Sequence, residues 1–307
     1  MATETTARDS IRETSDTAWV IGRKICLSPQ SSPPPTGAFW SDGAGSYYAI
    51  TDAHPAPVES RPLPPTSLFQ KVYDAGDCSA VWTIGEAYCK VHILDRRIPR
   101  AIREHVTLDR VKKRHPSFII PEVHHYAEFD GRSYLFASKV HVDTLGQAWA
   151  KMEEDTKRNC VLRVVSIIKE LAAWQSDEIS GADGEYMSDL FLTPLGTEKD
   201  CSPQNLLRNC TELGMNVSKF LFYHCDLGPG NIIVDTAGAI VGIIDWETAG
   251  FVPREWIRTK FCISSGLDLP ADDMKERMDW RGRVQKELGR EGFPEIAERW
   301  FPWWSRD

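Results

Sequence analysis

The sequence has no long apolar stretch. No run within the 307 residues approaches the ~20 apolar residues that a membrane-spanning helix needs. The opening residues, MATETTARDSIRETSDTAW, contain no apolar segment of signal-peptide length. These absences predict a soluble cytoplasmic protein that has no membrane partner.

The sequence has fewer basic than acidic residues: 36 Lys and Arg against 44 Asp and Glu give a formal net charge of −8. A chain with this balance is a poor candidate for general binding of nucleic acid. The eight cysteines include no CxxC pair, so the usual spacing of a zinc site or a disulfide framework is missing. We therefore expect no nucleic-acid partner and free, mostly buried thiols.

Residues 1–66 lack the periodic apolar pattern of regular structure. Pro and Ser dominate the segments LSPQSSPPPTGAF and PAPVESRPLPPTS, and this composition favours irregular backbone. Trp19, Trp40 and Tyr48 interrupt it. We therefore expect an irregular arm that packs on the rest of the protein, with a disordered tail as the alternative. Such an arm would act as a lid or as a brace.

Strand patterns follow the arm. Three apolar or alternating runs between residues 68 and 94 are separated by glycine turns, and a further pair of runs flanks Asp130-Gly131, a strong signal for a hairpin. Residues 99–115, between these groups, have helical spacing. Residues 67–141 are thus predicted to form a five-stranded antiparallel sheet with one helix.

Helical periodicity replaces the strand pattern near residues 138–145. It is clearest over residues 158–175, where apolar side chains from Leu162 to Ile168 and beyond fall on one face of the predicted helix. We therefore expect residues 142–307 to form a mainly helical lobe.

The stretch FYHCDLGPGNIIVD, residues 222–235, places His224, Asp226 and Asn231 before a predicted β-hairpin that ends at Asp245. In an antiparallel pair, the start of one strand and the end of the next become neighbours, which brings Asn231 beside Asp245. Amide and carboxylate oxygens suit Mg²⁺. Asp226, in the preceding turn, could accept the proton of an attacking hydroxyl. The alternative for Asp226 is an ordinary turn-forming aspartate.

The segments HCDLGPGNIIVD and IVGIIDWETAGFVPREW resemble the catalytic and metal-binding segments of the aminoglycoside phosphotransferase and choline kinase-like family, especially its fungal small-molecule kinases. The resemblance implies a bilobal α+β protein of protein-kinase-like fold, with a small antiparallel five-stranded N-lobe and a mainly helical C-lobe. It also demands a lysine on the third strand and a glutamate on the next helix. Lys90 and Glu104 meet these demands in the required order.

The resemblance assigns a role to each of these residues. Lys90 would bind the donor phosphates, Glu104 would hold Lys90, and His224 would brace the catalytic turn. Ser138 and Val140 occupy the expected hinge. The full assignment is Asp226 for catalysis, Asn231 and Asp245 for the metal, Lys90, Glu104, Ser138 and Val140 for the nucleotide, and His224 and Glu247 in support.

The implied cofactors are Mg²⁺ and ATP, with GTP as the other candidate donor. The implied reaction is transfer of a phosphoryl group to a hydroxyl of a small molecule, which could be cationic because the protein is acidic. The first hairpin offers only Gly76 and Gly85 for a phosphate-binding loop. This departure leaves an alternative open: a kinase-fold biosynthetic enzyme or binding module that cyclises or dehydrates a small metabolite without phosphotransfer. A protein kinase is disfavoured, since Ile-Asp-Trp-Glu replaces Asp-Phe-Gly.

Overall fold

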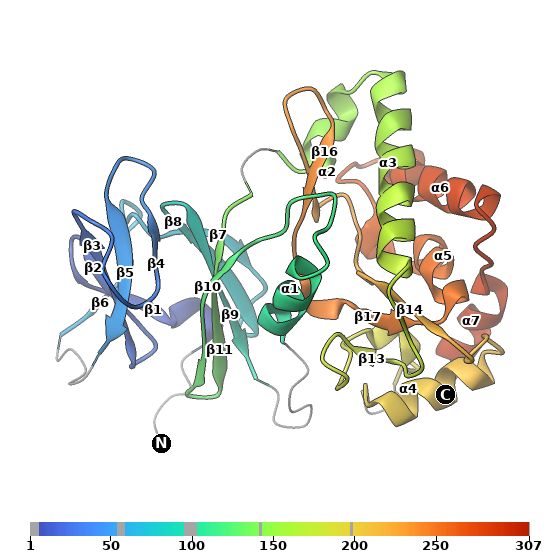
Figure 1. Ribbon diagram of the computed structural model, residues 1–307, viewed down its shortest axis with the longest axis horizontal. Helices are drawn as coiled ribbons and strands as arrows, with labels where there is room; N and C mark the ends of the chain where they lie inside the picture. The colour runs from blue at the N-terminus through green and yellow to red at the C-terminus, as the bar shows by residue number, and fades with distance from the viewer. Residues whose placement is uncertain (1–5, 54–58, 95–102, 141–142, 197–198, 307) are drawn as a thin grey trace. The chain divides into compact units, whose positions relative to one another are not determined.

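A computed structural model describes residues 6–53, 59–94, 103–140, 143–196 and 199–306. The chain divides into two compact units. The N-terminal unit comprises Met1–Pro99 and Pro121–Lys139, and the C-terminal unit comprises Arg100–Ile120 and Val140–Asp307. The first is built from sheets and the second mainly from helices (Figure 1), so the predicted α+β class with antiparallel sheets is confirmed.

The N-terminal unit contains the predicted five-stranded antiparallel sheet, with strand order β10-β11-β9-β8-β7. Along its central strand, buried and partly exposed side chains alternate, as a sheet covered on one face requires. The strands are β7 (Gln70–Asp74), β8 (Ser79–Ile84), β9 (Ala87–Ile93), β10 (Val123–Phe129) and β11 (Arg132–Ser138).

The segment expected to be an irregular arm forms a second, six-stranded antiparallel sheet, with order β4-β5-β3-β2-β1-β6. The expectation was wrong because the prolines inside its strands are paired on one side only. Pro29 pairs with Tyr48 of β5 but lies beyond the end of the pairing between β3 and β2, and Pro62 pairs with Arg12 from the edge strand β6. The elements are η1 (Ala7–Asp9), β1 (Ile11–Ser15), β2 (Ala18–Ile21), β3 (Ile25–Gln30), β4 (Phe39–Ser41), β5 (Tyr47–Asp52) and β6 (Arg61–Pro62).

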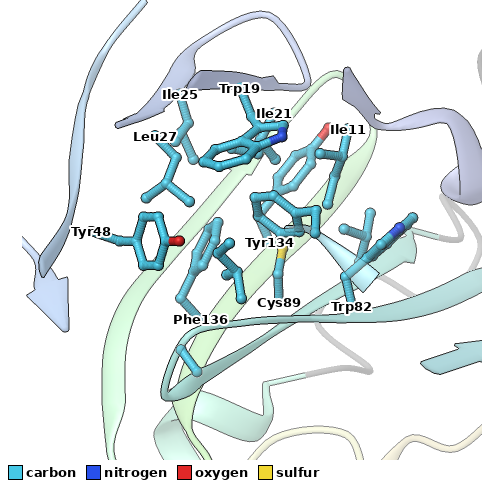
Figure 2. Close-up of a cluster of buried hydrophobic side chains, with 14 of the residues drawn as sticks. Ile11, Trp19, Ile21, Ile25, Leu27, Tyr48, Trp82, Cys89, Tyr134 and Phe136 are labelled. Carbon is cyan, nitrogen blue, oxygen red and sulfur yellow. The ribbon is translucent and has the colours of Figure 1, made fainter. Parts of the chain in front are cut away.

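One apolar core joins these two sheets (Figure 2). Trp19 is fully buried and makes edge-on contacts with Tyr48 and Phe69, while Trp40 stacks on Phe136 of the five-stranded sheet. Each such large side chain contributes about 1.5–3 kcal/mol when fully buried. The core is formed from side chains of both sheets, including Ile11, Trp19, Ile21, Leu27, Trp82, Cys89, Tyr134 and Phe136. The six-stranded sheet therefore packs on the five-stranded one, and its action as a brace stays a prediction.

Residues 100–120 were predicted within the N-lobe, but they group with the C-terminal unit. Backbone bonds account for the difference: Ile119 N–H donates to the Val241 carbonyl at 2.8 Å, and Ile243 N–H donates to the Ile119 carbonyl at 2.9 Å. The predicted helix over 99–115 is described as α1 (Glu104–Lys112). Residues 99–102 of that prediction lie outside the described residues.

In the C-terminal unit, α6 contacts both α3 and α5, and α5 also contacts α7 (Figure 1). The amphipathic helix predicted over 158–175 is present as α3, whose buried face runs from Cys160 to Ala172. Leu162, assigned to that face, is 45% exposed. The helices are α2 (Leu145–Ala148), η2 (Trp149–Lys151), α3 (Glu154–Ala172), η3 (Leu190–Leu192), α4 (Pro203–Glu212), η4 (Trp246–Thr248), α5 (Arg254–Ile263), η5 (Ser265–Leu267), α6 (Met274–Arg290) and α7 (Ala297–Trp304).

Short strands supply the framework of the C-terminal unit. One sheet has the order β12-β14-β17-β13, and the predicted hairpin is formed by β15 and β16. The strands are β12 (Gln175–Ser176), β13 (Ser180–Gly181), β14 (Phe220–Tyr223), β15 (Ile232–Val234), β16 (Ile240–Ile243) and β17 (Gly250–Val252). Among the described helices, none has both the length and the apolar character that crossing a membrane would take.

Candidate active site

A buried histidine fixes the turn that leaves β14. The His224 side chain is fully buried, and its Nδ1 accepts a hydrogen bond from the Asp226 N–H at 3.3 Å. The ring proton therefore sits on Nε2, which donates to the Ile244 carbonyl at 3.0 Å. His224 thus ties the turn to the hairpin, and its supporting role in catalysis stays a prediction. Cys225, between the two, adopts a left-handed φ of 63°, a conformation that glycine adopts more readily.

Asn231 holds Asp226 at the other end of the turn. Its Nδ2 donates to the Asp226 backbone carbonyl at 2.8 Å and to the Asp226 Oδ2 at 3.1 Å. Burial raises the pKa of Asp226 to about 6, and the positive charge of Lys260 opposes that shift. Asp226 is therefore a carboxylate at neutral pH that could serve as a base.

The hairpin brings Asn231 next to Asp245, as its spacing predicted. Ile232 pairs with Ile243, and the Ile244 N–H donates to the Asn231 carbonyl at 3.0 Å. The chain then turns at Asp245, which has a left-handed φ of 65°. Aspartate tolerates this conformation better than most residues with a side chain. The negative charge of Asp245 contributes to the raised pKa of Asp226, so the two carboxyl groups lie close enough to interact.

Two glutamates complete a group of acids around Asp245. Carboxylate oxygens of Glu104, Asp245 and Glu247 all lie within 4.8 Å of one another. Two oxygens bound to one Mg²⁺ at about 2.1 Å lie at most about 4.2 Å apart. Small side-chain rotations would therefore let oxygens of this group share one hard cation. The donor chemistry fits Mg²⁺, with Asp245 and the neighbouring Asn231 as the residues that would hold it.

Glu104 and Lys90 belong to different units. Glu104 is buried at the start of α1 and accepts a hydrogen bond from the Trp246 N–H at 3.0 Å, which ties α1 to η4. Lys90 lies on β9 between Val81 and Leu135. Its position alternates with the buried Cys89, so it lies on the sheet face opposite the six-stranded sheet. The predicted pairing of Lys90 with Glu104 stays a prediction.

The two predicted hinge residues also fall in different units. Ser138 ends β11, and its Oγ accepts a hydrogen bond from the Glu122 N–H at 2.8 Å. Val140 is buried in the C-terminal unit, where its side chain lies against Gly242: a β-carbon on that glycine would be only 2.9 Å from Val140 Cγ1. Their role in nucleotide binding also stays a prediction.

A buried ion pair that we did not predict from the sequence lies close to the catalytic turn. Lys260 on α5 lies 3.0 Å from Asp189 Oδ1, and the two side chains are 4% and 1% exposed. Trp256 Nε1 donates to the other Asp189 oxygen at 2.7 Å. Trp256 and Lys260 are four residues apart, so a lysine on the apolar side of the helix was the available signal. The charge of Lys260 acts on Asp226 as well as on Asp189.

Comparison with known proteins gives a family match. The family model described as the phosphotransferase enzyme family matches residues 79–256, more than half of the chain. No curated protein sequence matches.

Several solved structures are similar to the chain. One is aminoglycoside phosphotransferase APH(3'')-Id from Streptomyces rimosus, with 15% identity, a TM-score of 0.48, and coverage of 76% of this chain and 90% of that one. Another is APH(2")-IIa in a ternary complex with streptomycin and ATP, with 20% identity, a TM-score of 0.49, and coverage of 75% and 80%. A third is ADP-bound APH(2'')-Ib, with 17% identity, a TM-score of 0.47, and coverage of 73% and 78%.

Proposed function

The chain belongs to the phosphotransferase enzyme family, and from this premise we propose that it transfers the terminal phosphoryl group of Mg-ATP to a hydroxyl of a small molecule. The observation that carries the proposal is the arrangement of Asp226, Asn231 and Asp245. A turn braced by a buried histidine and a hairpin of defined register hold these three residues together.

Asp226 acts on the acceptor in this proposal. Its carboxylate orients the acceptor hydroxyl and takes its proton as the oxygen attacks the γ-phosphorus. The new O–P bond forms while the bond between the γ-phosphorus and the β–γ bridging oxygen breaks, and ADP leaves. Such catalysis consists largely of positioning and charge neutralisation. The hydrogen bond from Asn231 keeps Asp226 in a fixed orientation before the acceptor binds.

The other predicted site residues would bind the phosphoryl donor, Mg-ATP. Asn231 and Asp245 would hold Mg²⁺, which supplies charge neutralisation for the phosphates when bound. Lys90 would contact the donor phosphates and Glu104 would hold it, while Ser138 and Val140 would border the nucleotide base. Glu247 supports the metal site from the acid group. ATP is the proposed donor, and GTP is tested beside it.

The acceptor is proposed to be a small hydroxylated molecule. The formal net charge of −8 by itself favours a cationic acceptor. Net charge does not locate charge at the site, however. The charges that line the pocket beside Asp226 are the better guide.

The test is an ADP-release screen. The full chain is incubated with Mg-ATP, or with Mg-GTP, and a panel of hydroxylated metabolites. The release of ADP or GDP is measured for wild type and for Asp226→Asn. Asp177→Asn is the matched control, because the Asp177 side chain is 82% exposed and pairs with Lys219, whose side chain is 54% exposed. We expect acceptor-dependent release from wild type and Asp177→Asn, and loss of about 10²–10⁴-fold in Asp226→Asn.

Two results would contradict the proposal. Full turnover by Asp226→Asn would remove that residue from catalysis. The absence of acceptor-dependent release, together with no thermal shift on adding Mg-ATP or Mg-GTP, would favour the alternative of a kinase-fold enzyme or binding module without phosphotransfer.

A further inference from the structure

A pocket of about 320 Å³ opens beside the catalytic turn, within the C-terminal unit. This volume is at the small end of the range for ligand pockets, roughly 300–1,000 Å³. The pocket reaches Asp226 at Gly266, because a β-carbon built on Gly266 would lie 3.8 Å from Asp226 Oδ1. The lining residues that matter here are Gln147, Pro229, Gly230, Gly266, Asp268 and Arg277.

The pocket walls are attached to the catalytic turn. The Gly146 N–H, on α2, donates to the carbonyl of Pro229 at 2.9 Å. On the other side, a β-carbon on Gly228 would lie only 2.9 Å from the Gly266 carbonyl oxygen, so these two loops are in close backbone contact. A molecule bound in this pocket would therefore be held in a fixed relation to Asp226.

Apart from Asp226 at its edge, the pocket takes its charge from one aspartate and two arginines. Asp268 and Arg277 are the charged residues among the described side chains that line it. Arg281 is not among the residues that line the pocket, and its side chain is 12% exposed. It contacts Asp268 Oδ1 at 2.5 Å and also donates to the Cys262 carbonyl. That contact already compensates the Asp268 charge. Arg277, 39% exposed, reaches Asp268 Oδ2 only at 3.4 Å.

Arg277 therefore carries surplus positive charge toward the pocket. A guanidinium has five N–H donors in a planar fork. Within the described part of the chain, the side-chain bond found for Arg277 is the long one to Asp268. A carboxylate or a similar oxyanion matches such a fork in charge and in geometry, whereas an ammonium group would be repelled.

We propose that this pocket binds the acceptor and that Arg277 recognises an anionic group, such as a carboxylate, on a hydroxylated acceptor whose hydroxyl faces Asp226. This inference rests on the proposed function for the identity of the ligand as acceptor. It replaces the cationic acceptor suggested by net charge. Arg277 lies outside residues 79–256, so the family match does not assign it a role.

The experiment uses three six-carbon polyols that differ in charge: gluconate, glucitol and glucamine. Their binding to the full chain is measured calorimetrically without nucleotide, and their turnover with Mg-ATP is measured by ADP release. The variants are Arg277→Gln, Arg277→Lys and the control Arg290→Gln, whose arginine is on the same helix with a side chain that is 63% exposed. Melting temperatures establish that each variant is folded.

We expect gluconate to bind most tightly and glucamine most weakly. Arg277→Gln should weaken gluconate binding about 10- to 100-fold and leave glucitol nearly unchanged, since a bond to a charged group is lost. Arg277→Lys should retain part of the preference, and Arg290→Gln should retain all of it.

The inference is overturned if the three polyols bind equally, if glucamine binds most tightly, or if none of them binds. It is also overturned if the preference for gluconate survives Arg277→Gln. If gluconate binds through Arg277 but no ADP is released, the anion site stands and the proposed phosphotransfer fails. If ADP is released with glucitol or glucamine but gluconate is not preferred, phosphotransfer stands and the role of Arg277 fails.

Discussion

At the scale of single residues, the burial of Asp226 sets the pH range in which it can act. Its pKa is raised from 3.8 to about 6, chiefly by burial. The proton is therefore retained below about pH 6, and a protonated carboxyl cannot accept the proton of a hydroxyl. We expect kcat/KM to fall by about tenfold per pH unit below that value.

The measurement is the pH profile of ADP release between about pH 5 and 8. Melting temperatures taken at the same pH values separate loss of catalysis from unfolding. A profile without an acid limb near pH 6 in a folded protein would contradict the role of Asp226 as the base.

The Lys260–Asp189 pair makes a stability prediction at the same scale. Replacing Lys260 by Met leaves the Asp189 charge buried without its partner, which should lower the free energy of unfolding by about 3–5 kcal/mol. The double variant Lys260→Met with Asp189→Asn should recover most of that loss, because no net charge is then buried. Both are measured by urea denaturation.

Lys219→Met provides the matched control. It breaks the exposed Lys219–Asp177 pair, whose side chains are 54% and 82% exposed, and such pairs contribute less than about 1 kcal/mol. Equal effects of Lys260→Met and Lys219→Met on the free energy of unfolding would show that the buried pair contributes no more to stability than the exposed one.

At the scale of elements, the six-stranded sheet is expected to stabilise the N-terminal unit. Trp19→Ala should lower the free energy of unfolding by about 3–5 kcal/mol, since Trp19 is fully buried between the two sheets. The loss of stability would be measured as faster hydrogen exchange of the backbone amides in β8 and β9. Activity below the melting temperature should be retained, because the core lies on the sheet face opposite Lys90.

Leu68→Ala is the control for this prediction, as Leu68 is 54% exposed and its truncation should have little effect. Unchanged exchange in Trp19→Ala would show that the six-stranded sheet does not brace its neighbour. Loss of activity in a fully stable Trp19→Ala protein would favour a lid over a brace.

The elements also show where sequence was sufficient. The register of β15 and β16 depends on local pairing across a short turn, so the neighbourhood of Asn231 and Asp245 was predictable. Most pairs of the six-stranded sheet, such as β1 with β2 and β2 with β3, are just as local, although β1 also pairs with the distant β6. The strands are short and prolines surround them, which masks the strand pattern in the sequence. Lys260 was missed for a different reason, since its partner Asp189 is remote in sequence.

At the scale of the whole molecule, the family match and the N-terminal sheet concern different parts of the chain. The match covers residues 79–256, whereas the six strands of the first sheet end at Pro62. Catalysis is thus assigned to the matched region. The six-stranded sheet and the pocket residue Arg277, which we propose to recognise the acceptor, lie outside the matched region.

Transfer by this protein can be tested by following the phosphoryl group itself. ATP labelled at its γ-phosphoryl group is supplied with Mg²⁺ and the best acceptor of the screen, and label in the small-molecule product is measured for wild type and Asp226→Asn. We expect stoichiometric transfer by wild type and a loss of at least about 10²-fold in the variant, with nucleotide binding retained. Equal transfer by both proteins, or no labelled product from wild type with any acceptor, would contradict it.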